Sequence, residues 1–325
     1  MPRVSVIIPT YNRCRLVKEA VRSVLRQTLC DFEVIVVDDG STDDTGRVIR
    51  AVSDDRVKYI YKDNAGPASA RNVGMAHSKA EYLGFLESDD LWPEDFLATM
   101  VSRLEDNPEY GGAYCPFKDT YPGANEVVAF GKDRYMSGWL TRDFFERTPF
   151  IIPSATLFRR SAWQGVWWDE ALRSCDDIDA FLRICTQTKV LCVPDVCIIR
   201  RVTSDSLTSG NTVSISPIAT LIFERFYFDL AGHKYVPARL ARRRFSRMYR
   251  GMARQHHRAG NRRAAIMLFK KAIDYYPFDL KNYKWLLKSL LLSAEKDKMP
   301  DWQMPKPLPP HITVTNSIQD SNQSQ

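Results

Sequence analysis

The sequence Tyr82-Leu83-Gly84-Phe85-Leu86-Glu87-Ser88-Asp89-Asp90 is an apolar run that ends in three carboxylates. Apolar residues in a run of this length are typical of a strand that is buried on both faces. Open α/β sheets bind their ligands beyond the carboxyl ends of such strands. Carboxylates this close repel one another unless a cation or a proton intervenes, and their oxygens are the ligands that Mg²⁺ or Mn²⁺ prefers. The run therefore predicts a divalent metal that carries phosphates.

A structural interpretation of the same acids competes with the metal site. Ser88 or Asp89 would cap a helix that begins at Pro93-Glu94-Asp95-Phe96, because Pro is common in the first helical turn after a cap. The stretch alone leaves both interpretations open.

The composition indicates a globular protein with a large core. The chain has 325 residues, 44% of them hydrophobic, and a formal charge of +7. Its seven cysteines form no CxxC pair and are odd in number, which favours a reducing compartment and predicts mostly buried thiols. The chain begins with Met1-Pro2-Arg3 directly before an expected strand, which leaves no room for a signal peptide, and it has no 18 consecutive apolar residues. We therefore expect a cytoplasmic protein.

Strands alternate with helices over the first ninety residues. This alternation predicts a parallel, doubly wound sheet. The expected strands are 4–8, 32–37, 57–61 and 82–86, and the expected helices are 13–27, 41–52 and 67–77.

Polar groups suited to a nucleotide follow three of these strands. Tyr11 follows the first strand, Asp38-Asp39-Gly40 the second, and the acids of residues 87–90 the fourth. A Tyr can stack on a base, paired Asp can hold a base or a ribose, and a carboxylate cluster can hold a metal. Tyr11 as a packed side chain and Asp38-Asp39-Gly40 as a plain turn remain the structural alternatives. The sequence has neither GxGxxG nor GxxxxGK[ST], which argues against dinucleotide and P-loop sites.

Four motifs in this order resemble the family 2 glycosyltransferases, which have a GT-A fold. They are Val4-Ser5-Val6-Ile7-Ile8-Pro9-Thr10-Tyr11-Asn12, Val36-Val37-Asp38-Asp39-Gly40-Ser41-Thr42-Asp43, Gly66-Pro67-Ala68-Ser69-Ala70-Arg71-Asn72 and Phe85-Leu86-Glu87-Ser88-Asp89-Asp90. The resemblance extends from residue 3 to about 208. It implies a Rossmann-like mixed sheet sandwiched by helices, and an inverting transfer of sugar from a nucleoside diphosphate sugar, most simply a UDP-sugar, to a hydroxyl of a glycan or lipid-linked saccharide. It also implies Mn²⁺ or Mg²⁺ on the diphosphate.

The resemblance assigns the donor and metal residues. In the donor site, Tyr11 stacks on the base, Asp39 hydrogen-bonds it and Arg71 lies near the phosphates. The full set of donor residues that it implies is Pro9, Thr10, Tyr11, Asp38, Asp39, Arg71, Asn72, Ser88 and Asp89. The implied metal residues are Glu87, Asp89 and Asp90. Glu87 stands where the family pattern usually has Asp, so it is the weakest of the three assignments.

A second acidic pair, Asp176-Asp177, precedes an expected helix. Acids are favoured at a helix N-terminus on structural grounds. The resemblance implies instead that Asp177 is the catalytic base, with Asp176, Trp168, Arg200 and Arg201 around the acceptor or behind it. Two Trp in a row, 167 and 168, more often mean one side chain inside and one outside. Val202 occupies the position where many family members have a metal-binding His.

The C-terminal third is basic and helical. Residues 230–273 include no acid, and Gly260-Asn261 separates two amphipathic segments that resemble a single tetratricopeptide-type hairpin. A third segment, 283–292, combines Trp, Leu and Lys, which is typical of a membrane surface. A solvated basic face is one explanation and attachment to an anionic membrane is another; nucleic-acid binding is disfavoured because no recognised module is present.

These observations predict three regions. They are a GT-A transferase domain (1–210), a basic α-helical region (211–298) and a disordered tail (299–325). The prediction is a cytoplasmic, metal-dependent sugar transferase whose basic helical tail contacts a membrane, at its inner face, or a protein partner. The alternative is a non-catalytic protein of the same fold that acts through its basic tail, kept open by Glu87 and Val202. A nucleotidyltransferase is the weaker rival because its glycine-rich signature is missing.

Overall fold

The computed structural model describes residues 1–121, 127–129, 136–147, 151–202, 217–292 and 297–311. The chain forms two compact units. The first comprises Met1–Leu140, Phe150–Ser209 and His311–Gln325, and we call it the sheet unit. The second comprises Thr141–Pro149 and Gly210–Pro310, and we call it the helical unit. Two segments of the helical unit were expected in other regions. Thr141–Pro149 was expected in the transferase domain, and the residues between 299 and 310 were expected in the tail.

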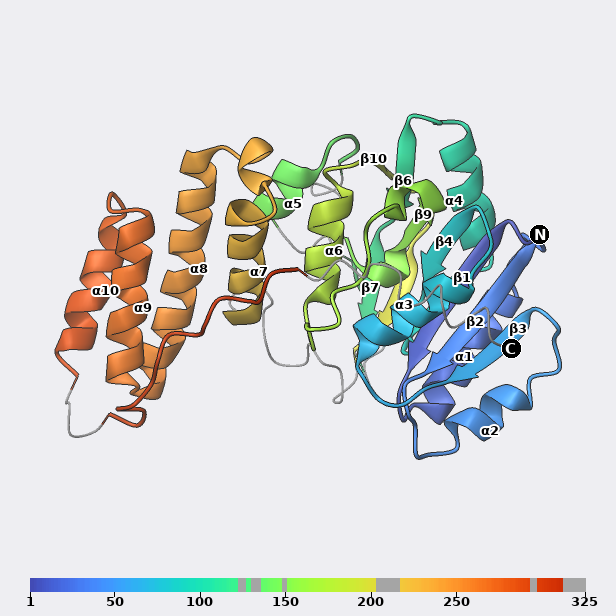
Figure 1. Cartoon of the computed structure of the whole chain (residues 1–325), viewed down its shortest axis with the longest axis horizontal. Helices are drawn as coiled ribbons and strands as arrows, with labels where there is room; N and C mark the ends of the chain where they lie inside the picture. The colour runs from blue at the N-terminus through green and yellow to red at the C-terminus, as the bar shows by residue number, and fades with distance from the viewer. Residues whose placement is uncertain (122–126, 130–135, 148–150, 203–216, 293–296, 312–325) are drawn as a thin grey trace. The chain divides into compact units, whose positions relative to one another are not determined.

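A mixed seven-stranded sheet forms the centre of the sheet unit (Figure 1). Its strands, in spatial order, are β10 (Lys189–Cys192), β6 (Tyr110–Tyr114), β9 (Thr156–Arg159), β4 (Tyr82–Phe85), β1 (Val4–Thr10), β2 (Phe32–Asp38) and β3 (Val57–Tyr61). Among the described strands of this sheet, β9 alone runs antiparallel to its neighbours. The predicted parallel order of the first four strands is confirmed, and their carboxyl ends lie along one edge.

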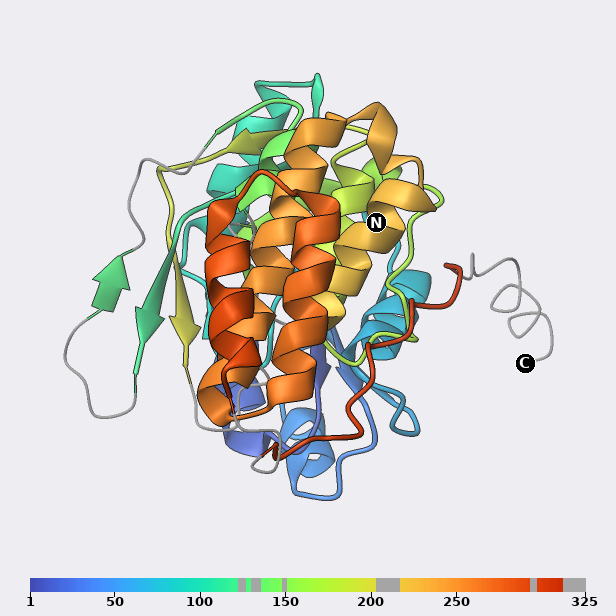
Figure 2. The ribbon, with the colours of Figure 1, turned by 90° about the vertical axis from the view of Figure 1, so that its left-hand side faces the viewer.

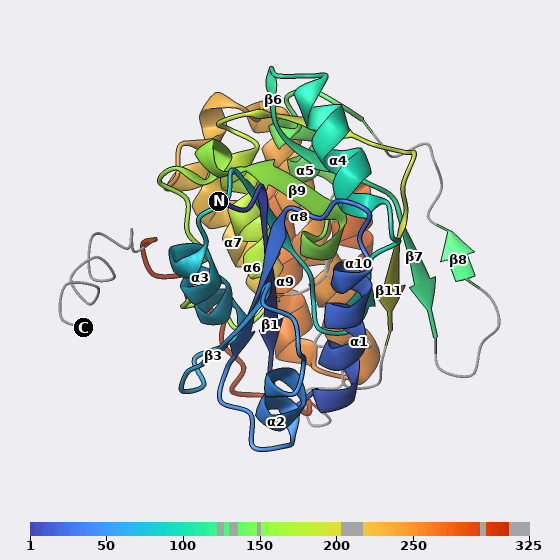
Figure 3. The same ribbon diagram turned by 90° about the vertical axis from the view of Figure 1, so that its right-hand side faces the viewer.

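Helices cover both faces of the sheet because successive strand residues point to opposite sides. On one face, Val6 and Ile8 share a core with α1 (Cys14–Leu25) and α4 (Phe96–Glu105). On the other face, α3 (Pro67–His77) packs on β1 and β2, and Figure 3 shows α1 and α3 on opposite sides of β1. Gly74 permits this close approach, because a Cβ there would lie 2.4 Å from Ile7 Cγ2.

The acids after β4 lead into another strand, not into a helix. Asp90 and Leu91 form β5, which pairs with β11 (Ile198–Arg201). β7 (Phe117–Thr120) and β8 (Val127–Ala129) complete this smaller sheet, in the order β5-β11-β7-β8. The N-cap of α4 is Asp95, so the alternative that Ser88 or Asp89 caps this helix is wrong.

The remaining elements of the sheet unit are short. They are α2 (Thr45–Arg50), the 3₁₀ turns η2 (Pro153–Ala155) and η3 (Arg160–Trp163), and α6 (Asp176–Ile184). The expectation of mostly buried cysteines is wrong, because only two of the seven, Cys115 and Cys185, are buried. Cys30 is exposed, and the other four are partly buried, namely Cys14, Cys175, Cys192 and Cys197.

The helical unit contains α5 (Thr141–Arg147), α7 (Pro217–Phe228), η5 (Gly232–Lys234), α8 (Ala238–Ala259), α9 (Arg262–Tyr275) and α10 (Leu280–Leu290). The expected helical hairpin is present: α8 packs along α9, and α9 along α10 (Figure 2). Gly260 ends α8 with a φ of 80°, a backbone conformation that glycine adopts without strain. The sequence did not predict α7.

The residues after 298 are partly ordered, which corrects the expectation of a disordered tail. Trp302 and Met304 pack against the cluster formed by α8 and α9. The rest of that expectation, residues 312–325, lies outside the described residues. Among the helices that the structure describes, none is both long and apolar enough to cross a membrane.

Candidate functional site

The acids at the carboxyl end of β4 are held by basic side chains. Glu87 accepts a hydrogen bond from Arg71 Nη2 at 2.5 Å, and Asp89 forms an ion pair with Arg13. The side chain of Glu87 is 30% exposed and that of Asp89 is 14% exposed, whereas Ser88 is buried. Glu87 and Asp89 are thus the accessible carboxylates at this edge.

Asp90 is buried, unlike the other two acids. Its two oxygens accept hydrogen bonds from Ser154 Oγ and from the backbone N–H of Arg201. Burial raises the pKa of Asp90 well above its usual value, and the charges of Asp89 and Glu87 raise it further. A hard divalent cation relieves this kind of crowding among carboxylates. Glu87, Asp89 and Asp90 thus offer the oxygen ligands that Mn²⁺ or Mg²⁺ prefers. Their ligand atoms are not gathered within 4.8 Å of one another in this structure, where Glu87 and Asp89 pair with Arg71 and Arg13.

Arg71 connects this edge to the second acidic pair. Its guanidinium is buried, pairs through Nη1 with Asp176 and through Nη2 with Glu87, and lies 4.5 Å from the ring centroid of Trp168. The pKa of Arg71 is raised, because Asp176 and Glu87 outweigh the lowering that burial causes. One side chain thus brings residues 87 and 176 together from distant parts of the sequence.

Asp177 lies beside this connection in the first turn of α6. Its side chain is partly accessible, and its Oδ1 accepts a hydrogen bond from the backbone N–H of Ile178 at 2.9 Å. Burial within the site raises the pKa of Asp177 to about 7, and the negative charge of Asp176 adds to the rise. The preceding residue, Cys175, has a φ of 60°, a conformation that costs energy for a non-glycine residue. A partly accessible carboxylate with this pKa is suited to accept a proton near neutral pH.

The acids that follow β2 organise the loops around them. Asp38 accepts hydrogen bonds from the Ser41 N–H and the Tyr59 hydroxyl, at 2.8 and 2.7 Å. Asp39 accepts bonds from Lys62 Nζ at 2.6 Å and from the Gly66 N–H at 2.7 Å. Both acids are buried. They therefore fix the turns at this edge. The remaining lone pairs of Asp39 could accept a hydrogen bond from a nucleotide base.

The turn after β1 presents Tyr11 to solvent. Pro9 and Thr10 are buried at the end of the strand, whereas Tyr11 is 48% exposed. Asn12, with a φ of 50°, accepts a hydrogen bond from the Thr42 N–H at 2.8 Å, which joins this turn to the loop after β2. The alternative of a packed Tyr11 does not agree with this exposure.

Two of the predicted site residues have structural partners instead of free surfaces. Asn72 accepts a hydrogen bond from the backbone N–H of Trp168 and donates to its carbonyl, both at 2.9 Å. Trp168 is 1% exposed and packs against Phe85 and Phe181, while Trp167 is half-buried. Trp168 therefore cannot offer a stacking face to an acceptor sugar and instead supports Arg71 from behind.

Arg200 and Arg201 lie on β11, next to β5. Arg200 makes a bidentate pair with Asp119, at 2.7 and 2.8 Å. Arg201 bonds to the carbonyl oxygen of Asp89 and to Glu19. Arg201 thus braces the loop of acids, whereas Asp119 on β7 holds the guanidinium of Arg200.

Several residues that bind the predicted site residues were not identified from the sequence. They are Arg13, Lys62, Asp119 and Ser154. Arg13 directly follows the turn after β1, so its position at the sheet edge was an available signal. The pairing of Ser154 with Asp90, 64 residues away, had no local signal.

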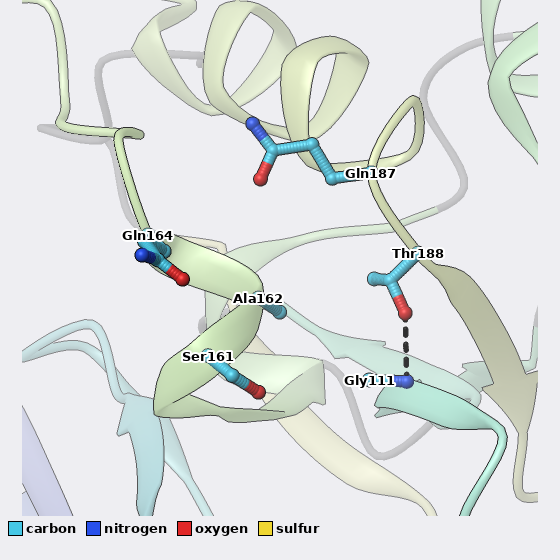
Figure 4. A pocket seen from close by; sticks show the side chains of 6 residues that line it. All are labelled: Gly111, Ser161, Ala162, Gln164, Gln187 and Thr188. Carbon is cyan, nitrogen blue, oxygen red and sulfur yellow. Dashed lines mark hydrogen bonds between the residues drawn. The ribbon is translucent and has the colours of Figure 1, made fainter.

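Two other features lie outside the set of predicted site residues. Ligand atoms of Asp169, Asp179 and His311 lie within 4.8 Å of one another, but Arg183 already binds Asp179 with two hydrogen bonds. A shallow pocket of about 380 Å³ lies near the start of β6 (Figure 4). It is lined by Gly111, Ser161, Ala162, Gln164, Gln187 and Thr188, and no charged side chain is among them. Since β6 runs parallel to β4, this pocket lies at the opposite edge of the sheet from the acids.

The sequence matches a known family over half its length. The pattern for "Glycosyl transferase family 2" covers residues 5–167. The chain belongs to this family. The match includes the edge from Tyr11 to Asp90 and ends before Asp176 and Asp177.

Curated relatives of this family member include longer proteins. An uncharacterised glycosyltransferase of Rickettsia conorii is 44% identical over 199 residues, which are 58% of this chain and 31% of that protein. One of Rickettsia typhi is 30% identical over 218 residues, covering 66% of this chain and 68% of the relative. The chain thus spans less than a third of the first relative and about two thirds of the second.

Solved structures share the fold at low identity. TarS 1-349 of S. aureus, in complex with UDP-GlcNAc, aligns with a TM-score of 0.59 and 17% identity over 87% of this chain and 92% of that one. The mannosyltransferase PcManGT of Pyrobaculum calidifontis, in complex with GDP-Man and Mn²⁺, has a TM-score of 0.55 and 21% identity over 89% of this chain and 86% of that one. The predicted GT-A fold with C-terminal helices is confirmed.

Proposed function

We propose that this protein transfers a sugar, with inversion, from a nucleoside diphosphate sugar to a hydroxyl of a glycan or lipid-linked saccharide. Family membership supports the reaction class. The complexes of the two structural neighbours, with UDP-GlcNAc and with GDP-Man, support a nucleotide-sugar donor. A UDP-sugar is the donor that we would test first.

The observation that carries this proposal is the Arg71 connection. Because one guanidinium contacts both Glu87 and Asp176, the acids after β4 and the start of α6 form one site. A donor held at the first would present its anomeric carbon toward the second. If the catalytic base lay far from the donor site, the protein could bind the donor but could not transfer its sugar.

Asp177 is the proposed base. Its carboxylate takes the proton of the acceptor hydroxyl as that oxygen attacks the anomeric carbon. The bond between this carbon and the diphosphate oxygen breaks, and the nucleoside diphosphate leaves with the electron pair. Attack on the face opposite the leaving group inverts the configuration.

The acids after β4 are the proposed metal ligands. When bound by Glu87, Asp89 and Asp90, Mn²⁺ or Mg²⁺ supplies positive charge for the diphosphate. Arg71, which the sequence analysis assigned to the phosphates, already has two carboxylate partners, and we assign it a positioning role. At the nucleotide end, Tyr11 would stack on the nucleotide base, and Asp39 would accept a hydrogen bond from that base.

A donor panel tests the proposal. Release of nucleoside diphosphate from UDP-, GDP- and dTDP-sugars should depend on Mn²⁺ or Mg²⁺. Asp177→Asn should lose transfer and keep donor binding in calorimetry. Asp195→Asn, a change to an exposed acid of the same unit, is the matched control and should leave both unchanged. Failure to bind or turn over any donor would favour the non-catalytic alternative.

We also propose that the protein works as a peripheral protein on the cytoplasmic face of an anionic membrane. The basic composition of residues 230–273 supports this location, because lipid-linked acceptors are found there and each Lys or Arg near an anionic surface adds attraction.

A further inference from the structure

Helix α10 buries two polar side chains and exposes most of its leucines. Asn282 and Ser289 are fully buried. Asn282 Nδ2 donates to Ser246 Oγ at 2.9 Å, and Ser289 Oγ lies 3.0 Å from His257 Nδ1, with both partners on α8. Trp285 and Leu286 pack on the same inner side, against the apolar cluster of α8 and α9, so the inner face is mixed. Helices of globular proteins normally place their large apolar residues toward the core, whereas α10 turns most of its leucines outward.

The outer face of α10 is a stripe of large apolar residues. Leu280, Leu287 and Leu291 are 79%, 62% and 86% exposed, and Tyr283 and Leu290 complete the stripe. Their spacing of three, four or seven residues places them on one side of the helix. Phe278, directly before the helix, is 81% exposed. Single exposed apolar residues are ordinary, but a contiguous stripe marks an interaction surface.

A row of lysines borders the stripe. Lys281, Lys284 and Lys288 are exposed and are also three and four residues apart, so they lie side by side along the helix. The sequence from 280 to 292 has no acid, and Asp279, just before it, pairs with Arg250. The face of α10 thus combines an apolar centre with one positive edge.

We propose that this face lies in the interface of an anionic lipid bilayer. Leu287 and Leu291 enter the boundary between head groups and acyl chains, and the lysines reach the lipid phosphates beside them. Lys is depleted in protein–protein interfaces, whereas Lys beside Leu is what surface-lying helices use. This inference deepens the peripheral attachment proposed above by naming its surface, and vesicle binding is measured without any sugar donor. Its failure is therefore distinguishable from failure of the transfer reaction.

Sedimentation of the full chain with vesicles tests the proposal. The protein should bind vesicles of phosphatidylcholine mixed with phosphatidylglycerol, and bind those of phosphatidylcholine alone far more weakly. Lys284→Gln/Lys288→Gln should lower the partition coefficient about tenfold or more. Lys79→Gln/Lys118→Gln, which removes the same charge from exposed positions of the sheet unit, should leave it unchanged.

The apolar stripe of α10 is tested with a second matched pair of variants. Leu287→Gln/Leu291→Gln should lower the partition by about tenfold or more, and Leu287→Met/Leu291→Met should retain it, because methionine keeps the apolar surface. Both positions are exposed, so folding should tolerate either change.

Three results would overturn the proposal. One is the absence of binding to anionic vesicles, and another is equal binding to neutral ones. The third is a dimer in analytical ultracentrifugation that the glutamine pair dissolves, since the stripe would then bind a second copy of the chain.

Discussion

A carboxylate oxygen of Glu87 lies 2.5 Å from Nη2 of Arg71. The same guanidinium pairs with Asp176, so it joins the end of β4 to the start of α6. The sequence analysis made Glu87 the weakest metal assignment and placed Arg71 near the phosphates. The contact gives Glu87 a second task, which is to fix the cation that holds Asp176, the neighbour of the proposed base.

Removal of Arg71 should strongly destabilise the sheet unit. Arg71→Gln leaves Asp176 buried without its cation, a change that costs about 3–5 kcal/mol in the free energy of unfolding. Asp176→Asn in the same chain should recover part of this loss, because no buried charge then remains. Urea denaturation of both single variants and the double variant measures the coupling. Arg47→Gln, which removes an exposed pair with Asp44, is the control and should have no measurable effect. Additive losses would show that the two residues do not interact.

Local patterns predicted β1 to β4 and α1 to α3 of the sheet unit, and long-range contacts explain most of what they missed. β4 was predicted from its apolar run, and the placement of acids at its carboxyl end followed from strand direction. The pairing of Asp90 with β11 could not be predicted, because β5 is two residues long and depends on a partner 110 residues away. The burial of Trp168 and the partners of Arg71 likewise depend on packing between distant segments. In α10, two buried polar residues share the inner face with Trp285 and Leu286 while most of the leucines face outward, and periodicity does not indicate this choice.

Transfer should depend on the protonation of Asp177. The pKa of this carboxyl is raised to about 7 in the folded protein, so the basic form is lost below that pH. The rate should fall about tenfold for each pH unit below the pKa and level off above it. Asp176→Asn removes a negative neighbour and frees the charge of Arg71, and both effects lower the pKa of Asp177. The pH–rate profile of the activity that this variant retains should therefore move toward lower pH. A shift toward alkaline pH, or none, would argue against Asp177 as the base.

Metal binding should respond in opposite directions to two substitutions at one ion pair. Arg13 pairs with Asp89, so in the metal-free protein it occupies a proposed ligand. Asp89→Asn removes a ligand charge and should weaken Mn²⁺ binding about tenfold or more. Arg13→Gln removes a competing cation and should tighten it. Calorimetric titration of Mn²⁺ measures both, and EDTA should abolish nucleotide release from the donor. Equal weakening in both variants would mean that Arg13 supports the site and does not compete for it.

The buried polar contacts of α10 should control which of its faces is exposed. Asn282→Leu leaves the Ser246 hydroxyl buried without its partner and should cost about 1–3 kcal/mol in the free energy of unfolding. Asn282→Leu/Ser246→Ala replaces both polar partners with apolar groups, a change that can be nearly neutral.

This double variant separates stability from orientation. With this contact gone, burial of the leucine stripe competes with what still holds the inner face, namely the Ser289–His257 contact and the packing of Trp285. We expect α10 to turn in part and to expose less of Leu287 and Leu291. We expect urea denaturation to give nearly the original stability, while the partition to anionic vesicles falls. Polar groups that are buried at a cost can specify one arrangement among several apolar ones, and this is the role that we assign to Asn282. A stable double variant that binds vesicles as well as the original chain would show that Asn282 contributes stability alone.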